Sequence, residues 1–117
     1  MISGIHSARS GLAAIQKKTE ATAHNVANAE TDGFKKIRVT LHEQEPQGIR
    51  AEARRMETPG PLVQEPTTDG SALVEKSNVE LSEELPGMML GRRMFQANLK
   101  TLRTADEMLG SLLDIKS

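Results

Sequence analysis

Apolar and small side chains recur at intervals of three and four positions in the amino-terminal part of the chain. The repeating positions are Ile5, Ala8, Leu12, Ile15, Thr19, Thr22, Val26 and Ala29. Because this spacing places side chains on one face of an α-helix, it predicts a helix over about residues 3–28. The stripe narrows where Thr19, Thr22 and Ala29 replace larger residues, so the helix needs a bulkier partner there.

A second helical pattern occupies the carboxyl-terminal part of the chain. Its apolar positions are Leu85, Met88, Phe95, Leu99, Leu102, Leu109 and Leu113. Arg92 and Asp106 stand between them on the same face. Pro86 and Gly87 interrupt the pattern, so we expect a short helical turn before Pro86 and a main helix after it, ending near residue 115. Pro86 is placed in the first turn, where its missing N–H costs least.

Between these helices, over about residues 36–76, the pattern changes to short alternating runs separated by turns. Residues 37–41 alternate between apolar and polar and predict one strand, and residues 49–53 predict a second, weaker one. Residues 62–63 and 73–74 suit short edge strands, with turns at 59–61 and 67–71. Short strands with few large apolar side chains are not stable alone. We therefore expect a hairpin or small sheet resting on the helices, with a disordered linker as the alternative.

These patterns predict a mainly α fold, in which two long terminal helices pack antiparallel as a coiled coil around a small β-hairpin or irregular middle segment. The chain divides into residues 1–33, 34–76 and 77–117. The leucine-rich stripe of the second helix complements the Ala- and Thr-rich stripe of the first; alternatively, each stripe pairs with another copy. The expected interface residues are Ile5, Leu12, Ile15, Val26, Leu85, Met88, Phe95, Leu99, Leu102, Leu109 and Leu113.

Composition narrows the function classes. Aromatic residues make up 2% of 117 residues, and both are phenylalanines, so a deep small-molecule or cofactor site is not expected. The net charge is -1 with acidic and basic residues interleaved, which disfavours nucleic acid and membrane surfaces as partners. No run approaches the ~20 apolar residues of a membrane span. The amino terminus lacks the basic and apolar regions of a secretory signal peptide, so any export is expected to use another route.

Candidate catalytic and metal-binding residues are equally sparse. There is no cysteine, and the three histidines, His6, His24 and His42, do not form a pair at ligand spacing. The adjacent Glu83 and Glu84 suit the dipole of a helix start without any catalytic role. No glycine-rich phosphate loop or nucleophile elbow occurs. We therefore expect no catalytic, cofactor-binding or metal-binding residues, and no enzymatic activity.

Residues 24–36, HNVANAETDGFKK, combine a helix end with turn-forming residues. This segment resembles the amino-terminal signature of the bacterial flagellar rod and hook family, in which an Asn-x-x-Asn helix end precedes Thr-Pro-Gly-Tyr and basic residues. The matching residues are Asn25, Asn28, Thr31, Gly33 and Lys35. Asp32 stands where the family usually has Pro, and Phe34 keeps the aromatic ring of the usual Tyr.

The carboxyl-terminal stretch resembles the second signature of the same family, which begins with Ser-Asn-Val and continues through Gln-Ala-Asn to Thr-Ala-Asp-x-Met-Leu. The matching residues are Ser77, Asn78, Val79, Glu83, Glu84, Gln96, Ala97, Asn98, Thr104, Ala105, Asp106, Met108 and Leu109. Pro86–Gly87 and the pair Arg92–Arg93 depart from the family pattern. Among the helical amides, Asn25, Asn28, Gln96 and Asn98 sit at helix surfaces, where they either fix register or face solvent.

The resemblance implies a structural axial subunit of the flagellar basal-body rod, exported through the flagellar type III apparatus without a cleaved signal. Its paired terminal helices are expected to polymerise into a helical tube that spans the periplasm. The implied partners are other copies of the chain, other rod and basal-body proteins and the export apparatus. The short middle segment favours a proximal-rod type of subunit. The alternative is a small coiled-coil adaptor or rod-family paralogue that forms a closed oligomer outside the rod.

Overall fold

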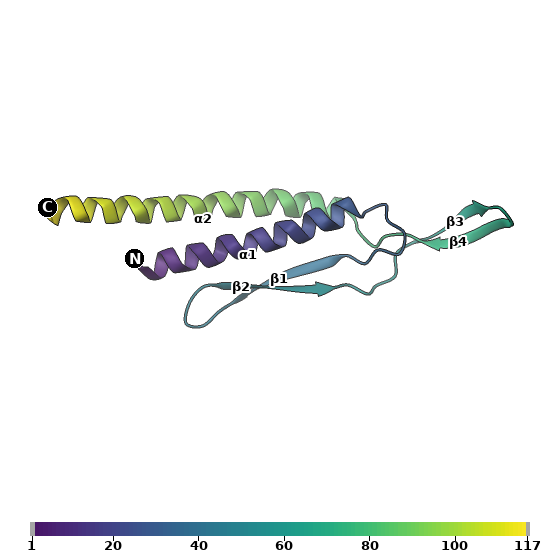
Figure 1. The fold of residues 1–117 in the computed structure, drawn as a ribbon, viewed down its shortest axis with the longest axis horizontal. Helices are drawn as coiled ribbons and strands as arrows, with labels where there is room; N and C mark the ends of the chain where they lie inside the picture. Colours follow the sequence, from purple (N-terminus) through teal and green to yellow (C-terminus); the bar gives the residue numbers. More distant parts are fainter. Residues whose placement is uncertain (1, 117) are drawn as a thin grey trace.

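The computed structural model describes residues 2–116 and is elongated, measuring 82 × 24 × 18 Å. In chain order, the elements are α1 (Ile2–Ala27), β1 (Ile37–Glu43), β2 (Ile49–Arg55), β3 (Leu62–Thr67), β4 (Gly70–Glu75) and α2 (Leu81–Lys116). The two helices run antiparallel, so both ends of the chain lie at one end of the molecule (Figure 1). The prediction of a mainly α fold with paired terminal helices and a small β segment is confirmed.

The middle of the chain forms two separate antiparallel hairpins rather than one small sheet. The β1–β2 hairpin lies along α1, with Val39 buried and opposite Ala53 in the register. The β3–β4 hairpin projects from the end of the molecule opposite the termini (Figure 1) and packs on none of the other helices or strands that the structure describes. Only the first hairpin therefore rests on the helices as expected.

Helix α2 passes through Pro86 without a break, so the prediction of a short helix followed by a second start at Pro86 is wrong. Proline lacks the N–H that would bond to the carbonyl of Ser82, four residues earlier. Only about one turn precedes it, and that turn is already closed by the N–H groups of Glu83 and Glu84, each 3.0 Å from the carbonyl of Glu80. The loss of one hydrogen bond so near the start leaves the helix intact.

Small and polar residues make up most of the buried positions of α1. The buried residues of α1 are Ala8, Gly11, Ala14, Ile15, Thr22 and Asn25. An added Cβ at Gly11 would lie 3.2 Å from Oδ1 of Asn98, so the backbone of α1 comes close to α2 at this point. Among residues 81–115 of α2, Gly91 is the one that is buried. The expected packing of leucines against Ala and Thr is thus only partly correct, because Gly11 and Gly91 also lie where the two helices meet.

An ion-pair junction joins the β3–β4 hairpin to the segment that follows α1. Glu75 pairs with Lys35 and accepts a hydrogen bond from the N–H of Gly60 at 3.2 Å. The bond from Lys35, followed by that from Gly60, holds the pKa of Glu75 below its ordinary value. Next to it, the pairing of Lys76 with Glu65 raises the pKa of Lys76. Both pKa shifts favour the charged form of the side chain, as expected for carboxylates and ammonium groups in ion pairs.

Gly60 has no room for a side chain, and we expect Gly60→Ala to destabilise the protein. An added Cβ would lie 1.9 Å from the carbonyl oxygen of Lys76, which is backbone and cannot rotate away. Such overpacking costs about 1–3 kcal/mol of unfolding free energy. Urea denaturation measures the loss, and Gly4→Ala is the matched control because nothing lies within 4 Å of its Cβ position. Equal stability of the two variants would contradict the geometry of this junction.

Candidate assembly surface

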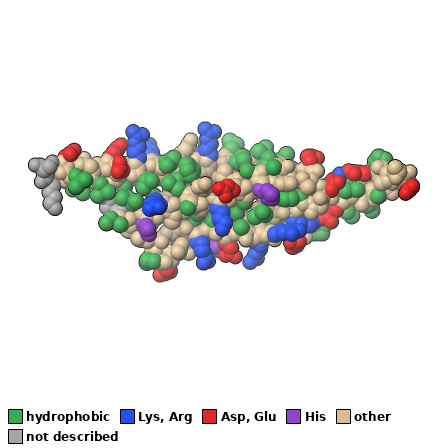
Figure 2. Space-filling view, in the orientation of Figure 1, with side chains coloured by type: hydrophobic (Ala, Val, Ile, Leu, Met, Phe, Trp, Pro, Cys, Tyr) green, Lys and Arg blue, Asp and Glu red, His purple; other side chains and the backbone are tan. Residues whose placement is uncertain are grey.

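A long apolar groove of about 1230 Å³ runs between α1 and α2. It is lined by Gln16, Thr19, Glu20, Ala23, Leu85, Met88, Met89, Gly91, Arg92, Phe95, Gln96 and Leu99. Hydrophobic side chains gather in patches along the helix pair in the space-filling view (Figure 2). The groove is open to solvent along the helices, which distinguishes it from an enclosed ligand cavity.

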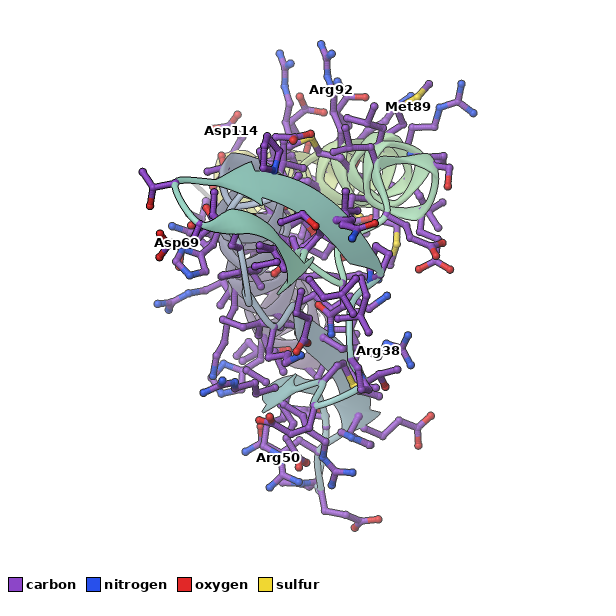
Figure 3. All side chains as sticks on the ribbon, turned by 90° about the vertical axis from the view of Figure 1, so that its right-hand side faces the viewer. Arg38, Arg50, Asp69, Met89, Arg92 and Asp114 are labelled. Atoms are coloured by element: carbon purple, nitrogen blue, oxygen red, sulfur yellow. The ribbon has the colours of Figure 1, made fainter. Side chains whose placement is uncertain are left out.

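The groove exists because the leucine stripe of α2 is turned partly away from α1. Met88 and Phe95 are half-buried, whereas Leu85, Met89 and Leu99 are exposed by 48%, 64% and 44%. Met89 and Arg92 project outward from α2 (Figure 3). The sequence pattern identified this face of α2, but the fold leaves half of it without a partner in the chain.

The remaining residues of the predicted interface differ in burial. On α1, Ile15 is buried, whereas Ile5, Leu12 and Val26 are half-buried. On α2, Leu102 and Leu109 are half-buried and Leu113 is exposed. The predicted α1 stripe is therefore offset from the observed one, because Gly11 and Asn25 take buried positions beside Leu12 and Val26.

A second apolar surface lies at the carboxyl end of α2, where the helix extends beyond α1 (Figure 1). Helix α2 has 36 residues and α1 has 26, and Gly4 lies beside residues 101–108 of α2. Residues 109–115, here called the α2 end, consequently have no α1 turn alongside them. Leu112, Leu113 and Ile115 are exposed there.

Asn25 ties α1 to the first hairpin from a fully buried position. Its side chain is 1% exposed; Oδ1 accepts from the N–H of Ile37 at 2.9 Å, and Nδ2 donates to the carbonyl of Ile37 at 2.8 Å. Nδ2 also donates to Glu84 of α2 at 3.3 Å. The expectation that Asn25 sits at the helix surface is wrong. Its spacing from Thr22 and Ile15 fits the buried stripe of α1, and this spacing could have indicated from the sequence that Asn25 is buried.

Asn78 plays a corresponding part at the start of the second signature. Its Oδ1 accepts from the N–H of Lys36 at 2.7 Å, and its Nδ2 donates to the carbonyls of Met56 and Thr58 at 2.9 and 2.8 Å. The preceding residue, Ser77, is also buried. This amide thus joins both ends of the β1–β2 hairpin to the chain entering α2.

The rest of the first signature shapes the turn after α1. Nδ2 of Asn28 donates to the carbonyl of His24 at 2.9 Å, and the hydroxyl of Thr31 donates to Oδ1 of Asn28 at 3.1 Å. Gly33 follows with a φ of 72°, a left-handed conformation that favours glycine. The ring of Phe34 meets that of His24 edge-on, with centroids 5.4 Å apart. Asn28 therefore stabilises its own turn.

The remaining signature residues differ in their surroundings. Asn98 is half-buried against Gly11 and donates to the carbonyl of Met94 at 3.1 Å, whereas Gln96 is exposed along the groove. Val79 is half-buried, and its N–H bonds to the hydroxyl of Ser77 at 3.2 Å. Ala97, Thr104 and Asp106 are exposed and Ala105 is half-buried. The signatures therefore combine fold-stabilising residues with surface residues of α2.

Two family models match the chain at the two segments that form the helix pair. The model described as flagella basal body rod protein matches residues 5–35. The model described as flagellar basal body rod FlgEFG protein C-terminal matches residues 71–115. The chain belongs to the flagellar rod and hook family. In this family member, the two matched segments are distant in sequence and are brought together by the fold.

Individual relatives cover only part of the chain. The hook protein FlgE of Borreliella burgdorferi is 40% identical over 47 residues, which is 40% of this chain and 11% of that protein. The basal-body rod protein FlgG of Bacillus subtilis is 41% identical over 46 residues, 39% of this chain and 17% of that protein. FlgE of Helicobacter pylori is 47% identical over 47 residues, 40% and 6% of the two chains. The match thus spans less than a fifth of each of these relatives.

Residues 2–116 were also compared with the requirements of a membrane span and of a metal site. No helix in that range has the length and apolar character to cross a membrane. Within the same range, no three side chains of His, Asp or Glu are grouped to hold a metal ion. His42 lies 3.7 Å from Glu52, its neighbour across the first hairpin. Exposed apolar side chains of this flagellar rod and hook family member gather at the groove and at the α2 end, which are its candidate functional surfaces.

Proposed function

We propose that this chain is a structural axial subunit of the flagellar basal-body rod, which assembles through its terminal helices into a helical tube. One observation carries the proposal: both family segments form a single helix pair, yet Leu85, Met89 and Leu99 on that pair remain exposed. Contiguous exposed apolar surface marks a site of protein association. In this proposal, residues 1–33 and 77–117 are the assembling parts and residues 34–76 are an insert.

The physics of repeated contacts agrees with an axial role. When one surface of a subunit binds a different surface of the next, the contact does not have to close, and the array grows as a helix. Each such contact stabilises the polymer by about 25 cal/mol per Å² of apolar surface removed from water. The groove and the α2 end are two different apolar surfaces on one chain, as such growth requires.

The short insert favours a rod subunit over a hook subunit. Only residues 36–70 lie between the two matched segments, and they form little more than the first hairpin and strand β3. The family resemblance implies a large outer domain at this place in hook and distal-rod subunits. A proximal-rod type is the form that suits this chain, with other rod and basal-body proteins as its neighbours. The proposal includes export by the flagellar type III apparatus into the periplasm-spanning rod, and no enzymatic activity.

Deletion of the gene tests this proposal in the cell. We expect the deletion strain to stop swimming and to show basal bodies with membrane rings but no completed rod by electron microscopy. Complementation with the unaltered gene is the control and should restore both. Swimming cells with intact basal bodies would overturn the rod assignment and leave the family relationship as ancestry.

Formation of a closed oligomer is the second candidate function. Leu85 and Leu99 are exposed apolar residues at helical spacing, and this pattern also suits a small helical bundle. The two candidates differ in stoichiometry. A coiled-coil adaptor gives one fixed mass in sedimentation over a wide range of concentration. A rod subunit gives monomers or open polymers of variable length.

A further inference from the structure

We propose that the α2 end of one copy docks in the groove between α1 and α2 of the next copy. This inference rests on the proposed function and deepens it, because it names the two surfaces that meet. The occupant is a second copy of this chain, contributing residues 109–115 of its longer helix.

The α2 end exposes large apolar side chains to solvent. Leu112, Leu113 and Ile115 are exposed by 54%, 69% and 82%. They lie in the part of α2 that extends past the first turn of α1 (Figure 1). Three exposed large aliphatic residues on fewer than three helical turns form an amphipathic end that is suited to a groove.

The groove matches this occupant in size and chemistry. Its volume of about 1230 Å³ exceeds the usual ~300–1,000 Å³ of small-molecule pockets. It is lined by residues of both helices, and the least exposed of its lining residues are Met88, Gly91 and Phe95 of α2. Gly91 is buried, and a Cβ added to it would lie 3.8 Å from the hydroxyl oxygen of Thr19, so its missing side chain lets α1 and α2 approach each other beneath the groove. A helical segment therefore fits better than a compact ligand.

Charge favours one rotational setting of the docked α2 end over the opposite one. The α2 rim of the groove carries Arg92, which projects outward (Figure 3), and the α1 rim carries Glu20. The α2 end is flanked by acidic residues, Asp106 before it and Asp114 within it. With the apolar side of this end in the groove, its acidic side is favoured beside Arg92 and disfavoured beside Glu20.

The two surfaces cannot meet within one chain. Phe95 in the groove and Leu113 in the α2 end lie on the same continuous helix, separated by roughly 27 Å at 1.5 Å per residue. With both copies pointing the same way, as this inference has them, docking joins two copies head to tail and displaces one from the other along the helix direction by about this distance. Such a contact is heterologous, and its repetition produces an open polymer.

Pairwise cysteine cross-linking tests the contact, since the chain has no cysteine of its own. Chains carrying Met89→Cys in the groove are mixed with tagged chains carrying Leu113→Cys and oxidised under assembly conditions. Leu90→Cys replaces Met89→Cys in the matched control, because Leu90 is the next residue and 56% exposed but does not line the groove. We expect at least about tenfold more mixed disulfide with Met89→Cys, because docking raises the effective concentration of the two thiols.

Electron microscopy and sedimentation of the same mixtures separate this inference from the proposed function. Polymers that form without a mixed disulfide at Met89→Cys, or with as much at Leu90→Cys, would overturn the docking geometry and leave the axial role standing. A closed oligomer of fixed mass would overturn both. Mixed disulfide at Met89→Cys alone, within open polymers, supports both.

Discussion

Replacing Asn25 by Ala is expected to lower the unfolding free energy by about 2–4 kcal/mol, because a buried donor or acceptor left without its partner costs ~1–3 kcal/mol each. The amide of Asn25 satisfies both the N–H and the carbonyl of Ile37 at the start of β1, and it reaches Glu84 on α2. Alanine removes all three bonds at once. The first hairpin should then detach from α1 before the helix pair separates.

Asn28→Ala provides the matched control, since Asn28 is the same residue type at the end of the same helix. Its bonds go to His24 and Thr31 within its own turn. Its loss should cost about 1 kcal/mol or less, the usual net contribution of one hydrogen bond. Urea denaturation followed by circular dichroism gives both values, and hydrogen exchange at Ile37 reports the hairpin directly. Similar losses in the two variants would show that Asn25 does not hold the hairpin.

The helices and the first hairpin were predictable because their signals are local. The three-and-four spacing of residues 5–29 depends only on helical geometry, and the alternation of residues 37–41 depends only on the pleat of a strand. The prediction at Pro86 was wrong because proline usually interrupts a helix. Its effect depends on how many turns precede it, and here about one turn does.

The faces that the helices present to each other were less predictable. A stripe of leucines indicates which side of α2 avoids water, but not which part of that side meets α1. The choice follows from close approach at Gly11 and Gly91, and from the space that the β1–β2 hairpin takes on α1. Both factors depend on tertiary packing and not on local sequence. The burial of Asn25 likewise depends on Ile37, which is distant from it in the sequence.

The hydrogen bonds of Asn25 and the exposure of the leucines of α2 are parts of one structural arrangement. Asn25 and Asn78 fix where the chain leaves α1 and enters α2, so they hold the register of the two helices. That register leaves the leucine stripe half open and extends the α2 end beyond α1. The polar core thereby positions the apolar surface that is available for assembly.

Leu99→Asp is expected to abolish assembly while leaving the monomer folded. Leu99 is 44% exposed in the groove, so its loss has little effect inside the chain. Leu102→Asp is a less specific test, because Leu102 is half-buried in the helix pair. In the assembled state, Leu99→Asp forfeits about 1.5–3 kcal/mol of apolar burial per contact and places an unpaired carboxylate in an apolar site.

Ala97→Asp is the matched control for this prediction, because it adds the same charge two residues away. Two helical residues correspond to about 200°, so Ala97 faces away from the side on which Leu99 lines the groove. Each 1.4 kcal/mol weakens a contact about tenfold, so Leu99→Asp should raise the concentration needed for polymerisation by 100-fold or more, and Ala97→Asp should leave it nearly unchanged. Sedimentation of the polymers and complementation of the deletion strain measure the two effects. Normal polymers from Leu99→Asp would remove the groove from the assembly contact.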